Sequence, residues 1–204
     1  MPTVRPWACS ACSSQWRHTE NAMLLERTLL AALVALLILA TALPGEAMEW
    51  NRSAIGEGQW WRLWTGQFCH WSSFHLAGNL AAVGAIALIA GSGIRRWLCT
   101  LPLLAPILSV FLLASAPALT HYRGLSGLVG VLIVGAALDG GTLGRLLGLA
   151  YLGKLGFDAV SGAHSPLLPE GITSTWQAHL GGVLLGAVTA AGLRRCRIER
   201  RSKS

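Results

Sequence analysis

Long apolar runs, separated by short polar connections, constrain this chain more than any other feature of its sequence. A run of about 20 apolar residues is long enough to cross the hydrocarbon core of a bilayer as an α-helix. The 204 residues are 53% hydrophobic and 12% charged, which is too apolar for an ordinary soluble domain. We therefore predict an all-α polytopic membrane protein with six transmembrane helices. The predicted spans are residues 28–43, 74–92, 97–119, 125–138, 146–157 and 176–193.

Two of these spans have rival interpretations. The first run is compatible with a cleaved signal peptide if the protein starts at Met23 rather than at Met1, but we favour a retained helix. The fifth run contains Lys154, whose long side chain can reach the membrane surface from near a helix end. The expected organisation is a polar N-terminal segment (1–22), a six-helix membrane domain (23–193) and a basic tail (194–204).

Basic residues predict the orientation of the spans. The formal net charge is +7, and six of the 16 Lys and Arg residues lie in the last eleven positions, beside an apolar run. This placement indicates a juxtamembrane segment rather than a surface that binds nucleic acid. With a cytoplasmic N-terminus, the inner segments carry twelve basic residues and the outer segments carry Arg52, Arg62 and Arg123. Both termini are therefore expected in the cytoplasm.

The cysteines give no signature of a metal or of redox chemistry. The five cysteines are scattered and odd in number, so they do not form a disulfide framework. Cys9 and Cys12 form a lone CxxC motif without a second pair of ligands, and the chain has no HExxH motif. We expect no metal site and no cofactor.

The polar segment between the first two spans is rich in tryptophan. Trp61, Trp64, Phe68 and Trp71 are three or four residues apart, so they would line one face of a helix. Amphipathic aromatic rings are enriched at the depth of the lipid headgroups. We predict an interfacial helix here, with Arg62 reaching lipid phosphate or nearby carbonyl groups.

Four polar residues are expected at one depth near the outer surface. His75 and Asn79 lie at the outer end of the second span. Ser126 and His179 lie at the outer starts of the fourth and sixth spans. Taken alone, a serine between glycines is a packing residue and a histidine is bonded to a backbone carbonyl. Because polar side chains in a membrane are costly and usually face the bundle interior, four of them at one depth indicate a site.

Small residues predict that the fourth and sixth helices pack closely. Gly182 and Gly186 continue a four-residue spacing that begins at Ala178, beside His179. Gly130 follows Ser126 at the same spacing. Such ridges let two helix backbones approach each other, which brings a serine on one helix within reach of a histidine on the other.

A serine and a histidine in this arrangement fit acyl transfer. The hydroxyl of Ser126 needs a base to take its proton, and His179 is the candidate base. Because Asp158 is placed in or near the loop before the last span, we predict a Ser–His dyad rather than a triad. Ser126 begins a helix, where free backbone N–H groups can stabilise a developing oxyanion, and His75 and Asn79 are candidate further donors.

The same residues resemble the rhomboid intramembrane serine proteases. The resemblance covers about residues 60–190. It runs in order through Trp61-Arg62, His70, His75-Leu76-Ala77-Gly78-Asn79, Gly124-Leu125-Ser126-Gly127 and Ala178-His179-Leu180-Gly181-Gly182, with Gly186. It implies that Ser126 is the nucleophile, that His179 is the general base, and that His75 and Asn79 help the Ser126 backbone N–H to hold the oxyanion. The implied fold is the six-helix rhomboid-like bundle.

The compact core and the loop at residues 59–71 are most similar to the rhombosortase branch. This similarity implies an endopeptidase of the bacterial inner membrane with its active site near the periplasmic side. The implied substrates are exported proteins that carry a C-terminal, Gly-Gly-containing hydrophobic anchor. The expected partners are therefore membrane-anchored proteins and the lipid bilayer, with no nucleic acid, and the oligomeric state is left open.

One position departs from the rhomboid pattern. Many rhomboids carry a tyrosine one helical turn after the serine, packed against the histidine, where this chain has Gly130. Another group must therefore orient His179. Two alternatives to a protease stay open: a catalytically inactive rhomboid-like binder or chaperone of anchored clients, and a small transporter, although no inverted repeat is visible.

Overall fold

The chain folds into a mainly helical structure, described by a computed structural model over residues 10–161, 165 and 167–201. Helices make up 75% of it, which confirms the predicted helical class. Cys9 of the CxxC motif and the last three residues of the basic tail lie outside the described part.

Each predicted span coincides with helical structure. Within the described residues, two segments are long and apolar enough to cross a membrane, Met23–Ala40 and Ser73–Leu98. Two shorter apolar helices follow, Leu101–Ser115 and Ser126–Asp139. The elements are α1 (Ser10–Ala40), α2 (Gly45–Met48), β1 (Trp50–Asn51), α3 (Arg52–Gly56), α4 (Arg62–Thr65), α5 (Ser73–Ala90), the 3-10 turn η1 (Gly91–Gly93), α6 (Ile94–Leu98), α7 (Leu101–Ser115), β2 (His121–Tyr122), α8 (Ser126–Asp139), α9 (Gly141–Ser161) and α10 (Trp176–Arg201).

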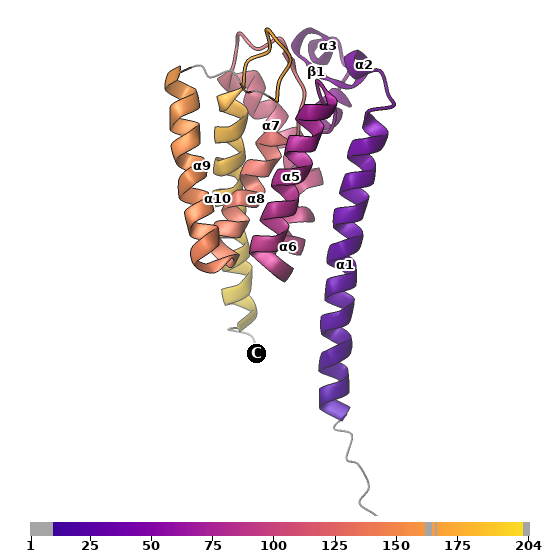
Figure 1. The fold of residues 1–204 in the computed structure, drawn as a ribbon, viewed down its shortest axis with the longest axis vertical. Coiled ribbons are helices and arrows are strands. Elements are labelled where there is room, and N and C mark those ends of the chain that lie inside the picture. Colours follow the sequence, from indigo (N-terminus) through magenta and orange to yellow (C-terminus); the bar gives the residue numbers. More distant parts are fainter. Residues whose placement is uncertain (1–9, 162–164, 166, 202–204) are drawn as a thin grey trace, which may run out of the picture.

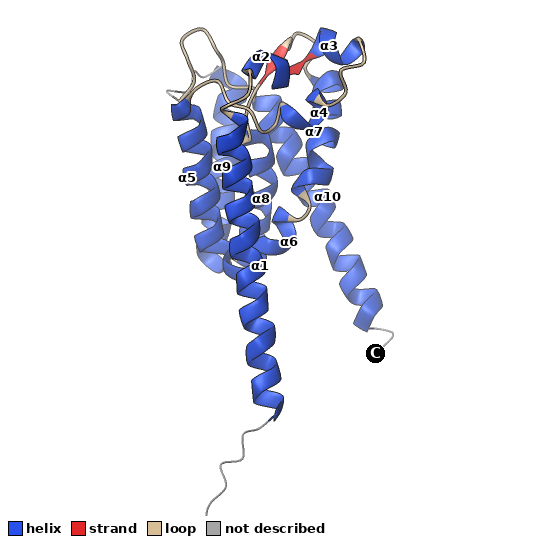
Figure 2. Ribbon diagram, turned by 90° about the vertical axis from the view of Figure 1, so that its right-hand side faces the viewer, coloured by secondary structure: helices blue, strands red, loops and turns tan. Residues whose placement is uncertain are grey.

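Helix α8 lies at the centre of the bundle (Figures 1 and 2). It contacts α5, α6, α7, α9 and α10, so its apolar side chains are buried around most of its circumference. Leu128 and Leu132 are fully buried and belong to one core cluster with Ile86 of α5 and Trp97 of α6. With 14 residues, α8 is shorter than α5, which has 18, and α10, which has 26.

Glycines bring α8 and α10 together, as the small-residue spacing predicts. A Cβ atom added to Gly182 of α10 would lie 1.8 Å from the carbonyl oxygen of Gly127 on α8. A Cβ atom added to Gly130 would lie 3.1 Å from the carbonyl oxygen of His179. The backbones of the two helices are therefore in direct contact, and any larger residue at Gly182 would force them apart.

The third predicted span is not a single helix. The chain forms the short α6, turns, and starts α7 with Pro102 in its first turn, a position that suits proline. The buried Trp97 donates its indole N–H to Asp139 Oδ2 at 2.9 Å, and Arg96 pairs with the same carboxylate. These contacts attach α6 to the end of α8, which explains the break in the run at residues 97–119.

The predicted interfacial helix through the tryptophans is wrong. Helix α4 contains four residues, and the chain turns at Gly66. An added Cβ at Gly66 would lie 2.5 Å from the backbone nitrogen of Trp50, so this segment is pressed against β1. Arg62 is buried and donates from Nη1 to the carbonyl oxygens of Glu46 and Glu49 at 2.8 and 2.9 Å. Lipid phosphate and carbonyl groups are the two kinds of partner predicted for Arg62, and the structure shows it bound to carbonyl groups.

A small sheet connects the first long loop to the segment before α8. Strands β1 and β2 are antiparallel, with Trp50 opposite Tyr122 and Asn51 opposite His121. The Gly124 backbone N–H also donates to the Gly66 carbonyl at 3.1 Å. The sequence patterns did not predict this sheet. It fixes the backbone that leads into Ser126.

The starts of α5, α8 and α10 share one end of the bundle (Figure 1). The start of α1 and the end of α10 lie at the opposite end. The helix starts that carry the predicted site residues therefore lie away from the start of α1 and the end of α10.

Candidate active site

Ser126 is the first residue of α8. The chain reaches it through Gly124, whose φ of 138° is a conformation that side chains rarely adopt. The ring of His75 occupies the space beside this glycine, because an added Cβ would lie 2.7 Å from His75 Cε1. The first glycine of the GLSG sequence thus lets His75 pack against the backbone just before the serine.

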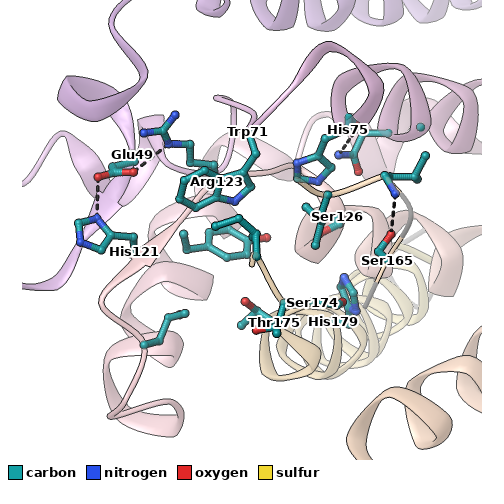
Figure 3. Close-up of a pocket in the computed structure, with 18 of the residues that line it drawn as sticks. Glu49, Trp71, His75, His121, Arg123, Ser126, Ser165, Ser174, Thr175 and His179 are labelled. Carbon is teal, nitrogen blue, oxygen red and sulfur yellow. Dashed lines mark hydrogen bonds and ion pairs between the residues drawn. The ribbon is translucent and has the colours of Figure 1, made fainter. Parts of the chain in front are cut away.

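Ser126, His179, His75 and Asn79 line one cavity of about 810 Å³. Figure 3 shows Ser126 between His75 and His179. The side chains come from three helices: α5 contributes His75 and Asn79, α8 contributes Ser126, and α10 contributes His179. His179 is 9% exposed, whereas Ser126 is half-buried. The structure therefore brings together all four residues that the sequence placed at one depth.

His75 and Asn79 lie one turn apart at the start of α5. The Ser72 hydroxyl caps this helix by accepting from the His75 backbone N–H at 3.1 Å. The Asn79 side-chain amide donates to the His75 carbonyl at 3.1 Å. An amide nitrogen carries two hydrogens, so Asn79 keeps a second one for a group in the cavity.

Tyr122 contacts the backbone on both sides of Ser126 and was not identified from the sequence. Its hydroxyl donates to the Gly124 carbonyl at 2.8 Å and accepts from the Gly127 backbone N–H at 3.4 Å. Burial raises the pKa of the Tyr122 hydroxyl to about 12, so it stays a protonated donor. Tyr122 therefore ties together the two glycines on either side of Ser126.

Asp158 and Tyr151 surround His179. Asp158 Oδ2 lies 3.7 Å from His179 Nδ1, and the Tyr151 ring meets the imidazole edge to face with 6.2 Å between the centroids. Asp158 is buried inside α9 rather than placed in a loop, which removes the reason for excluding an acidic partner of His179. Tyr151 of α9 therefore places against His179 the aromatic ring that Gly130 cannot provide.

A buried carboxylate organises the mouth of the cavity. Glu49 binds His121 Nδ1 through Oε1 at 2.6 Å and accepts from Arg123 Nε through Oε2 at 2.8 Å. The Arg123 guanidinium also lies over the Trp71 ring, 4.4 Å from its centroid. These contacts hold Arg123, three residues before Ser126, against the first long loop (Figure 3).

Cys69 and His70 are close to His75 in the chain but are not among the residues that line the cavity. Burial raises the pKa of the Cys69 thiol to about 12, so the reactive thiolate does not form at neutral pH. Burial, with a smaller effect of the neighbouring His75, lowers the pKa of His70 to about 4. The two imidazoles meet edge to face with 5.1 Å between centroids, so His70 supports the ring of His75.

The chemistry that the cavity offers is that of a hydroxyl nucleophile with an imidazole base and amide donors. Among the residues that the structure describes, no group of three or more His, Cys, Asp or Glu side chains is placed to hold a metal ion. No protein-family model, curated protein or solved structure matches this chain.

Proposed function

We propose that the protein is an intramembrane serine endopeptidase of the rhomboid type, with Ser126 as nucleophile and His179 as general base. The observation that carries the proposal is that Ser126, His179, His75 and Asn79 all line one cavity at the start of α8. These residues are distant in sequence, and each matches a motif in the resemblance to rhomboids. If Ser126 were only a packing residue and His179 were unrelated to it, the two would not need to line the same cavity.

The proposed reaction proceeds through an acyl-enzyme. His179 takes the proton of the Ser126 hydroxyl while Oγ attacks the scissile carbonyl carbon, forming a C–O bond and a tetrahedral oxyanion. The C–N bond then breaks, and protonated His179 gives its proton to the leaving amine. Water, deprotonated by His179, next attacks the ester carbonyl and releases the carboxylic acid and the Ser126 hydroxyl.

The oxyanion is held by donors already present around Ser126. The backbone N–H at the start of α8 lies at the positive end of the helix dipole. His75 and Asn79 contribute side-chain donors from α5, and both are buried, which strengthens their interaction with a developing charge. Removing one such donor lowers the rate by about a hundredfold to a thousandfold.

We further propose that the bundle crosses the bacterial inner membrane six times, with both termini cytoplasmic and the cavity near the periplasmic side. The two long apolar helical segments, the two shorter apolar helices and the basic tail support this arrangement. The proposed substrates are exported proteins with a C-terminal membrane anchor, of the Gly-Gly type by similarity to the rhombosortase branch.

The proposal is tested with a fluorescent fluorophosphonate, which forms a covalent bond with an activated serine. We expect purified wild-type protein in detergent to be labelled, and Ser126→Ala and His179→Ala to be unlabelled at equal amounts of folded protein. Both variants should also fail to cleave a co-expressed protein with a C-terminal anchor. Cleavage that persists in both variants contradicts the proposal. Absence of labelling in folded wild type supports the inactive binder or chaperone instead.

A further inference from the structure

We propose that Asp158 is a positioning residue that orients His179 for proton transfer. The proposal rests on the function proposed above and replaces a Ser–His dyad with a Ser–His–Asp triad in which Asp158 stays ionised. Asp158 Oδ2 is 3.7 Å from Nδ1 of His179, which leaves Nε2 as the ring nitrogen available to Ser126. A carboxylate at Nδ1 fixes the tautomer that has its proton there and stabilises the imidazolium formed when Nε2 accepts a proton.

The surroundings of the His179 imidazole support this role. Its Nδ1 is buried and has no hydrogen-bond partner among the described residues. Buried polar atoms are almost always bonded, so an unbonded ring nitrogen beside a carboxylate calls for an explanation. The 3.7 Å separation is about 0.5 Å longer than a hydrogen bond. Catalytic hydrogen bonds are often long without substrate and tighten when it binds.

The face of α9 on which Asp158 lies supports the same conclusion. Tyr151, Leu155 and Asp158 follow a spacing of four and three, so they share one face of the helix. Leu155 and Asp158 are buried, whereas Phe157 and Val160 on the other side of α9 are exposed. The helix thus presents an ionisable residue to the bundle interior, where its charge is costly unless it has a function or a partner.

Lys154 provides the competing explanation, because it pairs with Asp158 one turn away on α9. A purely structural role would make Asp158 the counter-ion of this lysine. However, the Lys154 side chain is 54% exposed, whereas that of Asp158 is 7% exposed. A long lysine side chain can reach the membrane surface without a buried partner, so Lys154 does not by itself account for a carboxylate facing His179.

The two explanations differ in the behaviour of a double variant. Asp158→Asn removes the carboxylate and leaves the side-chain volume unchanged. If Asp158 only neutralises Lys154, the variant Lys154→Gln/Asp158→Asn regains the wild-type rate because both charges are gone. If Asp158 orients His179, the double variant stays slow. Asp158→Glu keeps the carboxylate and should restore most of the rate lost in Asp158→Asn.

The experiment measures the rate of fluorophosphonate labelling of Ser126 against probe concentration, for full-length protein in detergent. We expect Asp158→Asn to lower the maximal labelling rate at least about tenfold, with the half-saturating probe concentration changed less than about twofold. The matched control is Asp139→Asn, which removes a carboxylate that is also paired with a basic residue, at the far end of α8. It should label like wild type.

The outcomes separate this proposal from the function on which it rests. An unlabelled wild type overturns the serine protease assignment and the role of Asp158 with it. A labelled wild type with an equally fast Asp158→Asn, or a double variant that recovers fully, overturns the positioning role alone. If Asp158→Asn does not accumulate because Lys154 is left without a partner, the double variant carries the same expectation.

Discussion

The contact between α8 and α10 should determine whether Ser126 and His179 can react, and Gly182→Ala tests it. The added Cβ would lie 1.8 Å from the Gly127 carbonyl oxygen, where real Cβ atoms stay at least 3.0 Å away. The added Cβ is fixed to the backbone of α10, and the oxygen it meets belongs to the backbone of α8. The helices must therefore separate by about 1.2 Å locally to relieve the clash. His179 is one helical turn before Gly182 on α10, so a shift of α10 at Gly182 also moves His179 away from Ser126.

A displacement of this size has two measurable consequences. A misplacement of about 1 Å between reacting groups can lower a rate by about a hundredfold, so labelling of Ser126 by the fluorophosphonate should slow by about that factor. Overpacking a close helix contact should also cost about 1–3 kcal/mol of stability, seen as a lower apparent Tm in detergent. Labelling is measured on the monodisperse fraction, well below that Tm.

Gly192→Ala is the matched control for Gly182→Ala. It makes the same change on the same helix, but nothing lies within 4 Å of the added Cβ. It should label like wild type and keep or slightly raise the Tm, because alanine favours a helix over glycine. Wild-type labelling and an unchanged Tm in Gly182→Ala would refute the reasoning that the glycine contact sets the distance between serine and histidine.

Two further predictions concern the first long loop. Arg62→Lys should lower stability by about 2 kcal/mol, because a lysine cannot reproduce the guanidinium contacts with the carbonyls of Glu46 and Glu49. Its Tm is compared with that of Arg145→Lys, a change at an exposed position, and equal values for the two variants contradict the prediction. His70 has a pKa lowered to about 4 by burial, whereas the unfolded chain has the ordinary value of 6.5, so the unfolded state binds more protons between these values. Stability should therefore fall as the pH falls from about 6.5 towards 4, and His70→Gln should flatten this Tm profile; an unchanged slope rules out His70 as its source.

The sequence predicted the helices well because their signal is local. Apolar runs identify a helix wherever the whole segment is hydrophobic, and each of the six runs coincides with helical structure. The break between α6 and α7 and the turn at Gly66 were missed because distant contacts produce them. Asp139 holds Trp97 from another helix, and Trp50 of β1 lies against Gly66. No periodicity within either segment contains that information.

The residues of the candidate site that belong to sequence motifs were predicted, and the others were not. Ser126, His179, His75 and Asn79 stand out as polar residues beside small ones in apolar runs, and they line one cavity. Tyr122 and Tyr151 carry no such local signal, because their roles depend on how β2 and α9 pack against α8 and α10. A signal for Asp158 was present: a lysine and an aspartate four residues apart, Lys154 and Asp158, within an apolar helix.

The central helix α8 is short for a membrane span. At 1.5 Å per residue, the 14 residues of α8 rise about 21 Å, well below the roughly 30 Å of a hydrocarbon core. In the proposed membrane arrangement, α8 therefore cannot reach both surfaces of the apolar layer, and the cavity that Ser126 lines gives water a path to the start of the helix. Because five other helices enclose α8, the bundle rather than the thickness of the lipid around it sets the depth of the serine.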